Sequence, residues 1–183
     1  TVYSDEGVTA IASGTISYSV NGGANTQTTT ADQGGQFTVS GATMTGGNII
    51  TLYLDGGTAT GVTVVLGSGS SMTGIYIYQN RLIVRSETGG TITNTHLATA
   101  DDSGDADITS IYEVTGNSLL VTGTSELLVW TGDTFAPGGA VAAGSGVDVN
   151  GTMSLLANQL TLSGSLDLTN GSMTSTGLVV FDG

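Results

Sequence analysis

The sequence predicts an all-β protein in which a β-sandwich over residues 1–95 is followed by a repeat-bearing β-solenoid, or by a second sandwich, over residues 96–183. Short runs of β-branched and aliphatic residues alternate with turns that draw on the chain's 30 glycines. The single proline and the low charge, 9% of residues, are unlike the composition of a disordered chain. The second half also repeats itself, which is typical of stacked β-structure.

The repeat is visible as two near copies. The segment 117–127 (NSLLVTGTSEL) returns as the segment 158–168 (NQLTLSGSLDL). A shorter pair is Asn150-Gly-Thr-Met and Asn170-Gly-Ser-Met. The sequence offset between its members is about half of the offset between the two longer segments. Both offsets fall in the range that is typical of stacked repeats, and the alternation of apolar and hydroxyl residues favours coils that stack on one another.

The first half contains short strands separated by glycine-rich turns. Residues 16–20 alternate in polarity, and Asn21-Gly-Gly supplies the positive φ angles of a hairpin turn. Further strands are expected at residues 26–30 (an edge strand), 36–40, 49–54 and 62–66. Strands repeated at this short spacing predict an antiparallel sandwich.

Residues 75–85 form the most hydrophobic segment and contain Arg81 and Arg85, the only two basic residues apart from one histidine. A strand period of two places the tyrosines of this segment opposite the arginines, unless Gln79-Asn80 is a turn. The arginines have two interpretations. They occupy solvated or edge positions that discourage aggregation, or they meet carboxylates of a neighbouring domain or subunit.

After residue 95 the predicted strands shorten to three to five residues, and no helix is expected because glycine and β-branched residues interrupt each window. The last strand, formed by Leu178, Val179, Val180 and Phe181, stops at a turn as though another copy should follow. An uncapped coil is prone to stack or pair, so these four residues are predicted to form an interface.

The charge balance restricts the partners. Fifteen acidic and two basic residues give a formal net charge of -13, too few cations for nucleic acid or an anionic membrane surface. Cysteine is absent, which removes disulfides and thiol chemistry, and no run of 18 apolar residues is present to span a bilayer. The acidic, lysine-free composition is typical of a secreted or surface protein of a prokaryote, and no signal peptide is evident.

Asp101, Asp102, Asp105 and Asp107 form the densest acidic cluster. Aspartates spaced around a glycine can wrap Ca²⁺ with oxygen ligands, although the helices and the final glutamate of an EF-hand are missing. The other interpretation is an acidic surface turn. Calcium is therefore the one cofactor that the sequence suggests.

Other chemistry-bearing residues are few. His96 is the single histidine, and no Gly-x-Ser-x-Gly motif accompanies it, so we expect no enzyme. Trp130 follows an apolar run and is expected to fill the core or cap the solenoid, with sugar stacking as the alternative. Asn150-Gly-Thr and Asn170-Gly-Ser match the N-glycosylation sequence and are also ordinary Asn-Gly turns.

The chain resembles repeat-rich bacterial cell-surface proteins, including filament, adhesin-like and autotransporter-passenger segments. The resemblance lies in the glycine-bounded runs, at residues 35–41, 133–139, 151–156, 164–168 and 177–183. The first half is similar to immunoglobulin-like sandwich modules by pattern. The resemblance implies an extracellular structural or adhesive role and carries no catalytic residues.

These observations favour a structural subunit of an extracellular prokaryotic fibre, sheath or layer that associates with other copies of itself through strand edges or solenoid ends. The alternative is an adhesive module that recognises carbohydrate or a host surface and in which calcium takes part. Neither function calls for nucleic acid or membrane insertion.

Overall fold

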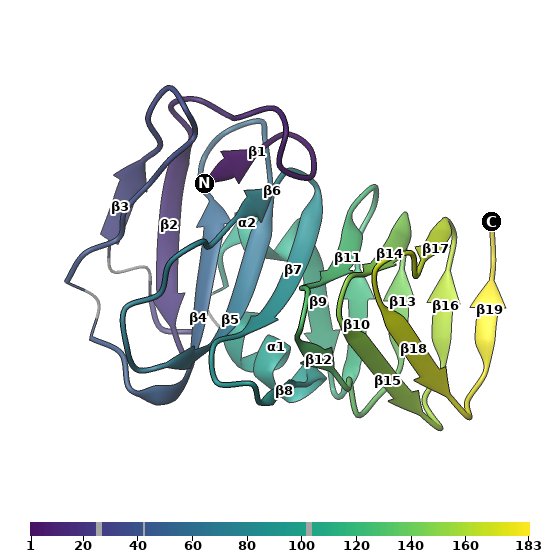
Figure 1. Cartoon of the computed structure of the whole chain (residues 1–183). Coiled ribbons are helices and arrows are strands. Elements are labelled where there is room, and N and C mark those ends of the chain that lie inside the picture. Colours follow the sequence, from purple (N-terminus) through teal and green to yellow (C-terminus); the bar gives the residue numbers. More distant parts are fainter. Residues whose placement is uncertain (25–26, 42, 102–103) are drawn as a thin grey trace.

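The computed structural model describes residues 1–24, 27–41, 43–101 and 104–183 (Figure 1). The chain is mostly β, with 44% strand and 7% helix, and winds into a β-solenoid of about six turns from residue 62 onward. In Figure 1 the N-terminal strands lie at one end and the C-terminal coil lies at the other. The predicted all-β class and the solenoid in the repeat-bearing half are confirmed.

Among the described residues the longest sheet has eight strands in the order β17-β14-β11-β7-β5-β4-β2-β3. The strands from β5 to β17 run parallel, whereas β5, β4, β2 and β3 pair antiparallel. Their bounds are β2 Thr15–Val20, β3 Gln27–Thr30, β4 Gly46–Leu54, β5 Val62–Ser68, β7 Arg81–Ser86, β11 Glu126–Val129, β14 Gly146–Val149 and β17 Ser165–Asp167.

Two further sheets complete the solenoid. A four-stranded parallel sheet contains β8 Thr91–Ile92, β12 Thr134–Phe135, β15 Thr152–Leu156 and β18 Ser172–Ser175. A five-stranded sheet contains β9 Tyr112–Thr115, β10 Ser118–Val121, β13 Val141–Ala143, β16 Leu160–Leu162 and β19 Val179–Phe181. Each regular coil contributes one strand to each of the three sheets, so β11, β12 and β13 are followed by β14, β15 and β16, and then by β17, β18 and β19.

The register explains the sequence repeat. Leu119 pairs with Val141, which pairs with Leu160, so the longer offset in the sequence spans two coils. Met153 pairs with Met173, so the shorter offset spans one coil. Alternate side chains point into the coils and form one continuous apolar core that runs from β4 and β5 to the last coil. The repeated apolar positions are thus the core-facing positions.

Glycines at the coil corners permit this close stacking. A Cβ at Gly151 would lie 2.3 Å from the carbonyl oxygens of Trp130 and Asp133 in the preceding coil, and a Cβ at Gly171 would lie 2.1 Å from that of Val149. Because real Cβ atoms do not approach backbone oxygen so closely, these two corners need a residue without a side chain. These glycines belong to the two Asn-Gly pairs of the repeat.

Two short helices were not expected from the sequence. Helix α1 covers Asn94–Asp101 and α2 covers Ala106–Thr109, and both pack over the inner face of β4 and its neighbours, where the solenoid begins. The prediction of no helix was wrong because side chains at the helix starts, those of Thr93 and Asp105, stabilise two short helices despite the glycines and β-branched residues nearby. Asp105 is the N-cap of α2, and its carboxylate accepts from the Asp107 amide at 2.9 Å.

The segment 1–61 does not form a clearly separate sandwich. Strands β2, β3 and β4 extend the same sheet that continues into the solenoid, and β5 and β7 already pair in parallel before residue 95. Residues 36–40, predicted as a strand, have no strand structure. The boundary near residue 95 therefore remains a prediction, while the sheet that crosses it is continuous.

Two short strands, β1 Val2–Tyr3 and β6 Ile77–Tyr78, pair in parallel on the outer side of the eight-stranded sheet. Gln79 and Asn80 form a turn between β6 and β7, with φ 55° at Asn80, so the turn considered for this segment is present. Because of that turn, β6 and the preceding Tyr76 leave the plane of the large sheet and lie over its outer face.

Candidate functional site

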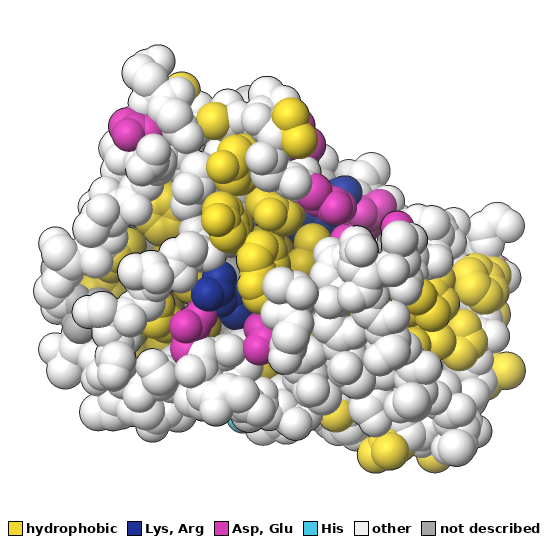
Figure 2. Space-filling view, in the orientation of Figure 1, with side chains coloured by type: hydrophobic (Ala, Val, Ile, Leu, Met, Phe, Trp, Pro, Cys, Tyr) yellow, Lys and Arg dark blue, Asp and Glu magenta, His cyan; other side chains and the backbone are white. Residues whose placement is uncertain are grey.

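The outer face of the eight-stranded sheet carries an aromatic cluster, which we define as Tyr3, Tyr76, Tyr78 and Trp130. The rings of Tyr76 and Trp130 stack with centroids 5.4 Å apart, and the tyrosine centroids lie 6.0 to 6.1 Å from one another. The cluster packs on Ile83 of β7 and Leu128 of β11, which point away from the solenoid core. Figure 2 shows apolar atoms gathered in the middle of this face.

Local structure fixes each ring. Trp130 directly follows β11, and its amide donates to the Val84 carbonyl at 3.0 Å. Because it comes two residues after the outward-facing Leu128, strand alternation places the indole on the outer side. Tyr3 and Tyr78 are register partners in the β1–β6 pair. The cluster thus joins the first strand of the chain to the middle of the solenoid. Aromatic packing of this kind adds about 1 kcal/mol per pair beyond area burial.

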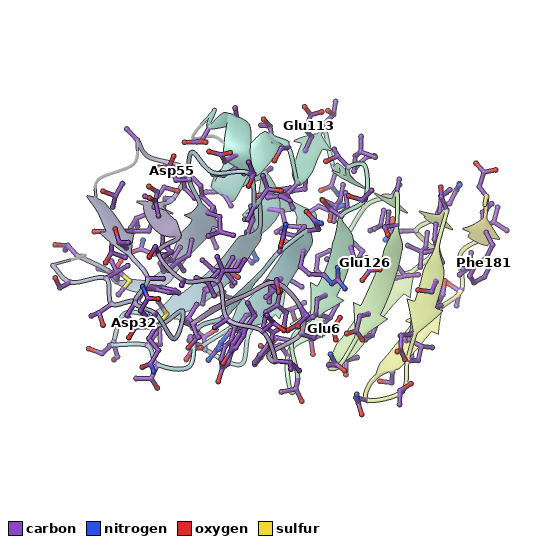
Figure 3. All side chains as sticks on the ribbon, turned by 90° about the horizontal axis from the view of Figure 1, so that it is seen from above. Glu6, Asp32, Asp55, Glu113, Glu126 and Phe181 are labelled. Atoms are coloured by element: carbon purple, nitrogen blue, oxygen red, sulfur yellow. The ribbon has the colours of Figure 1, made fainter. Side chains whose placement is uncertain are left out.

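Both arginines flank the cluster and are paired within the chain. One guanidinium nitrogen of Arg81 lies 2.8 Å from Glu126 and 3.3 Å from Glu6. Arg85 donates to Glu87 through Nε at 2.6 Å, and its guanidinium lies 5.5 Å from the centre of the Trp130 ring. Figure 3 shows Glu6 and Glu126 on the same side of the sheet. The predicted role of these arginines in contacts with another domain or subunit stays a prediction.

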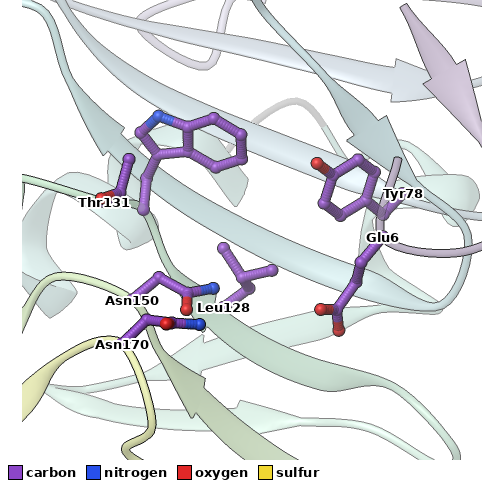
Figure 4. A pocket seen from close by; sticks show the side chains of 7 residues that line it. Glu6, Tyr78, Leu128, Thr131, Asn150 and Asn170 are labelled. Atoms are coloured by element: carbon purple, nitrogen blue, oxygen red, sulfur yellow. The ribbon is translucent and has the colours of Figure 1, made fainter. Parts of the chain in front are cut away.

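A groove opens beside the aromatic cluster, with a volume of about 490 Å³. It is lined by Glu6, Tyr78, Leu128, Trp130, Thr131, Asn150 and Asn170. In Figure 4 Asn150 and Asn170 lie side by side, Leu128 lies next to them, and Tyr78 and Glu6 face them from the other side. The lining thus combines apolar and aromatic groups with neutral hydrogen-bonding groups and one carboxylate, a mixture that is common in small-molecule sites.

The neighbouring carboxylates differ in their electrostatics. Asp148 of β14 and Asp167 of β17 are register partners on the outer face. Burial, and then the charges of Glu6 and Asp167, raise the pKa of Asp148 to about 6. Hydrogen bonds from Thr169 lower the pKa of the exposed Asp167. Asn150 donates to the Asp148 carboxylate at 2.9 Å. The face as a whole is negatively charged.

The described aspartates of the acidic cluster accept hydrogen bonds from β4, from β9 and from the turn after β4. Asp101 accepts from the Val114 amide at 3.3 Å, Asp105 accepts from the Tyr53 hydroxyl at 2.9 Å, and Asp107 accepts from the Gly56 amide at 2.8 Å. Asp102 lies outside the described residues. Within the described ranges no group of three or more acidic, histidine or cysteine side chains is placed to hold a metal ion. The calcium prediction, which includes Asp102, stays a prediction.

His96 lies in α1 rather than in a loop. Its Nδ1 accepts from the Thr93 amide at 3.3 Å, and its own amide donates to the Thr93 hydroxyl at 3.4 Å. This reciprocal pair resembles a capping box and satisfies two amides at the start of the helix. Burial lowers the pKa of His96. The geometry gives His96 a structural contact at the helix start.

In the part of the chain that the structure describes, the last coil has no further coil stacked on it, so one end of the solenoid is exposed. Among the strands that the structure describes, β17, β18 and β19 each have a partner on one side only. Leu178 and Phe181 are each 63% exposed, whereas Leu162, the register partner of Phe181 in the preceding coil, is 0% exposed. Val179 and Val180 are partly buried. In Figure 2 apolar atoms are visible over this coil, and Figure 3 places Phe181 at the end of the molecule.

A second hollow lies at the N-terminal end. It has a volume of about 620 Å³ between the outer face of β2 and β4 and residues 36–41 and 71–75. Its lining combines hydroxyl and amide side chains with apolar ones, among them Phe37, Met44 and Met72, which pack against the local core. No acidic or arginine side chain lines it among the described residues.

Sequence reasoning missed most of the groove. It singled out Trp130, Asn150 and Asn170, but not that successive coils bring the two asparagines together beside the indole. The regular offset between the two Asn-Gly pairs was the available signal. Tyr3 and Glu6 gave no signal, because they reach the site from the start of the chain through the β1–β6 pair.

The chain matches no protein-family model, no curated protein and no solved structure. Among the described residues, neither helix has the length and apolar character that crossing a membrane requires.

Proposed function

We propose that the chain is a structural β-solenoid subunit of an extracellular prokaryotic fibre, sheath or layer, and that its open coil pairs with the open coil of a second copy. The observation that carries the proposal is the contrast at the two ends of the solenoid. Helices and N-terminal strands cover the core where the solenoid begins, whereas the last coil exposes Leu178 and Phe181.

The open coil has the features of a β-pairing surface. The unpaired edges of β17, β18 and β19 offer main-chain donors and acceptors, and an exposed strand edge readily accepts another strand. Core-facing Leu166, Met173 and Val179 are only partly buried, so a second coil would cover them. A two-fold contact brings the same surface of both copies together, as in most homodimers.

A fibre or layer requires a second contact, and the opposite edge of the eight-stranded sheet supplies one. Strand β3 pairs with β2 alone and is the other edge of that sheet. The resemblance to bacterial surface proteins and the acidic, lysine-free composition support an extracellular location. The net charge of -13 opposes association, so the contact is expected to strengthen with salt.

Sedimentation velocity over a range of chain concentrations tests the proposal. The wild-type chain is expected to form dimers or larger species as its concentration rises. Met173→Lys places a charge on the core-facing side of β18 and is expected to abolish association. Thr174→Lys, on the adjacent outward-facing position of the same strand, is the matched control and is expected to associate as the wild type does.

Circular dichroism verifies that both variants keep the β-structure of the wild type. A wild-type chain that stays monomeric at every concentration and salt level contradicts the proposal whatever the variants do. Association that persists in a folded Met173→Lys variant would place the contact elsewhere and would also count against the open coil.

A further inference from the structure

We propose that the groove beside Trp130 binds a neutral carbohydrate chain, laid across successive coils of the solenoid. The site lies on the outer face of the eight-stranded sheet, whereas the association surface proposed above is the open end of the coils. The inference therefore stands on different residues and does not depend on self-association.

The groove has the size and rigidity of a ligand site. Its volume of about 490 Å³ falls in the range of small-molecule pockets, roughly 300 to 1,000 Å³. Tyr76 stacks on Trp130 and the Arg85 guanidinium lies over its ring, so the indole is held as a fixed wall. A preformed wall lowers the ordering cost of binding.

The lining matches the amphipathic surface of a sugar ring. Tyr78, Leu128 and Trp130 present apolar surface that suits the C–H face of a pyranose. Asn150 and Asn170 present carboxamides, each of which both donates and accepts hydrogen bonds, as hydroxyl groups do. Asn170 is exposed, and its carboxamide forms no hydrogen bond within the described part of the chain.

The charges favour a neutral ligand. Glu6 is the one charged residue among the described residues that line the groove, and it is already paired with Arg81 at 3.3 Å. No cation lines the groove in the described chain, and Asp148 and Asp167 lie on the same face, so an anionic polysaccharide would be repelled. The polar groups left for a ligand are uncharged: the Asn170 carboxamide, the Thr131 hydroxyl, and the second N–H and the oxygen of Asn150, whose other N–H donates to Asp148.

The spacing favours a chain over a single sugar. Asn150 and Asn170 occupy equivalent corners of successive coils, and adjacent strands are about 4.8 Å apart. Two equivalent carboxamides in a row can therefore contact successive hydroxyl groups along an extended oligosaccharide. Figure 4 shows these two side chains lying in the same direction.

Trp130 is the chain's only tryptophan, so its fluorescence reports on this groove alone. The probes are cellohexaose, xylohexaose and mannohexaose, titrated separately at a chain concentration where the protein is monomeric and checked by isothermal titration calorimetry. At least one of them is expected to give a saturable change. Asn170→Ala is expected to weaken that binding by about tenfold, because a hydrogen bond to the ligand is lost.

Thr176→Ala, an exposed corner residue of the same coil, is the control and is expected to bind as the wild type does. An oligogalacturonate probe is expected not to bind, because it is anionic. The absence of a saturable response to all three neutral probes overturns the proposal, as does unchanged affinity in Asn170→Ala. A response to tetramethylammonium in place of the sugars would identify a cation site and would overturn it as well.

Discussion

Adjacent coils of this solenoid place the same residue types in different surroundings. Met153 is 0% exposed in the second-last coil, whereas its register partner Met173 is only partly buried in the last one. Gly151 and Gly171 occupy the same corner, and Asp148 and Asp167 the same outer position. The sequence of the two coils is similar, so the difference comes from the presence of a further coil on one side. Burial in a solenoid is a property of the stack.

The comparison also separates two kinds of repeated residue. The core methionines and corner glycines serve stacking, and their environment changes when a neighbouring coil is missing. Asn150 and Asn170 lie on the outer face, where both contribute to one groove. A repeat thus maintains the fold on its inner side and builds an extended surface on its outer side.

The largest difference in stability between equivalent substitutions in the two coils is expected in the core. Met153→Ala leaves a cavity between two coils and is expected to lower the free energy of unfolding by about 3 kcal/mol. Met173→Ala removes a side chain that lacks a covering coil, and a loss of about 1 kcal/mol or less is expected. Urea unfolding of the monomeric chain, followed by circular dichroism, measures both. Equal losses would mean that the last coil is as well covered in solution as the inner one.

A smaller contrast is expected at the corners. Gly151→Ala sets a Cβ against two backbone oxygens of the preceding coil, with another coil behind it, and is expected to cost about 2 kcal/mol. Gly171→Ala meets a similar clash in the last coil, which can move outward, so about 1 kcal/mol is expected. The same unfolding measurement applies. A larger cost at Gly171 than at Gly151 would contradict the idea that the open coil can move outward.

The periodic part of the fold could be predicted from the sequence, and little else could. The offset between Leu119 and Leu160 spans two coils and that between Met153 and Met173 spans one, and both could be predicted because each coil repeats one local pattern. Thr93 and Asp105 are residue types that cap helices, so the sequence also contained signals for the two helix starts. The glycine-rich surroundings favoured strands and turns over helices in the prediction. The groove could not be predicted from the sequence, because Glu6 contacts Arg81 across a separation of 75 residues that no periodicity encodes.

The smallest difference between the two coils is expected in the effect of their carboxylates on stability, and the sign of that effect differs between Asp148 and Asp167. Burial, and next the charge of Glu6, raise the pKa of Asp148 to about 6, above the usual value near 3.9. Its protonated form is thus favoured by folding: the contribution is complete below about pH 4 and is lost as the pH rises through about 6. Asp148→Asn is therefore expected to stabilise the fold above pH 6, by about 1 kcal/mol after allowance for solvent screening, with no change near pH 4.

Asp167 supplies the matched test of that sign. Hydrogen bonds from Thr169 lower the pKa of this exposed carboxyl, so its ionised form stabilises the fold above the unfolded pKa and that contribution is lost as the pH falls through the folded value. Asp167→Asn is expected to reduce stability slightly at neutral pH, opposite to Asp148→Asn. Urea unfolding of both variants and the wild type at pH 4 and pH 7 compares them. Shifts of the same sign would show that net charge, and not the covering coil, governs both carboxylates.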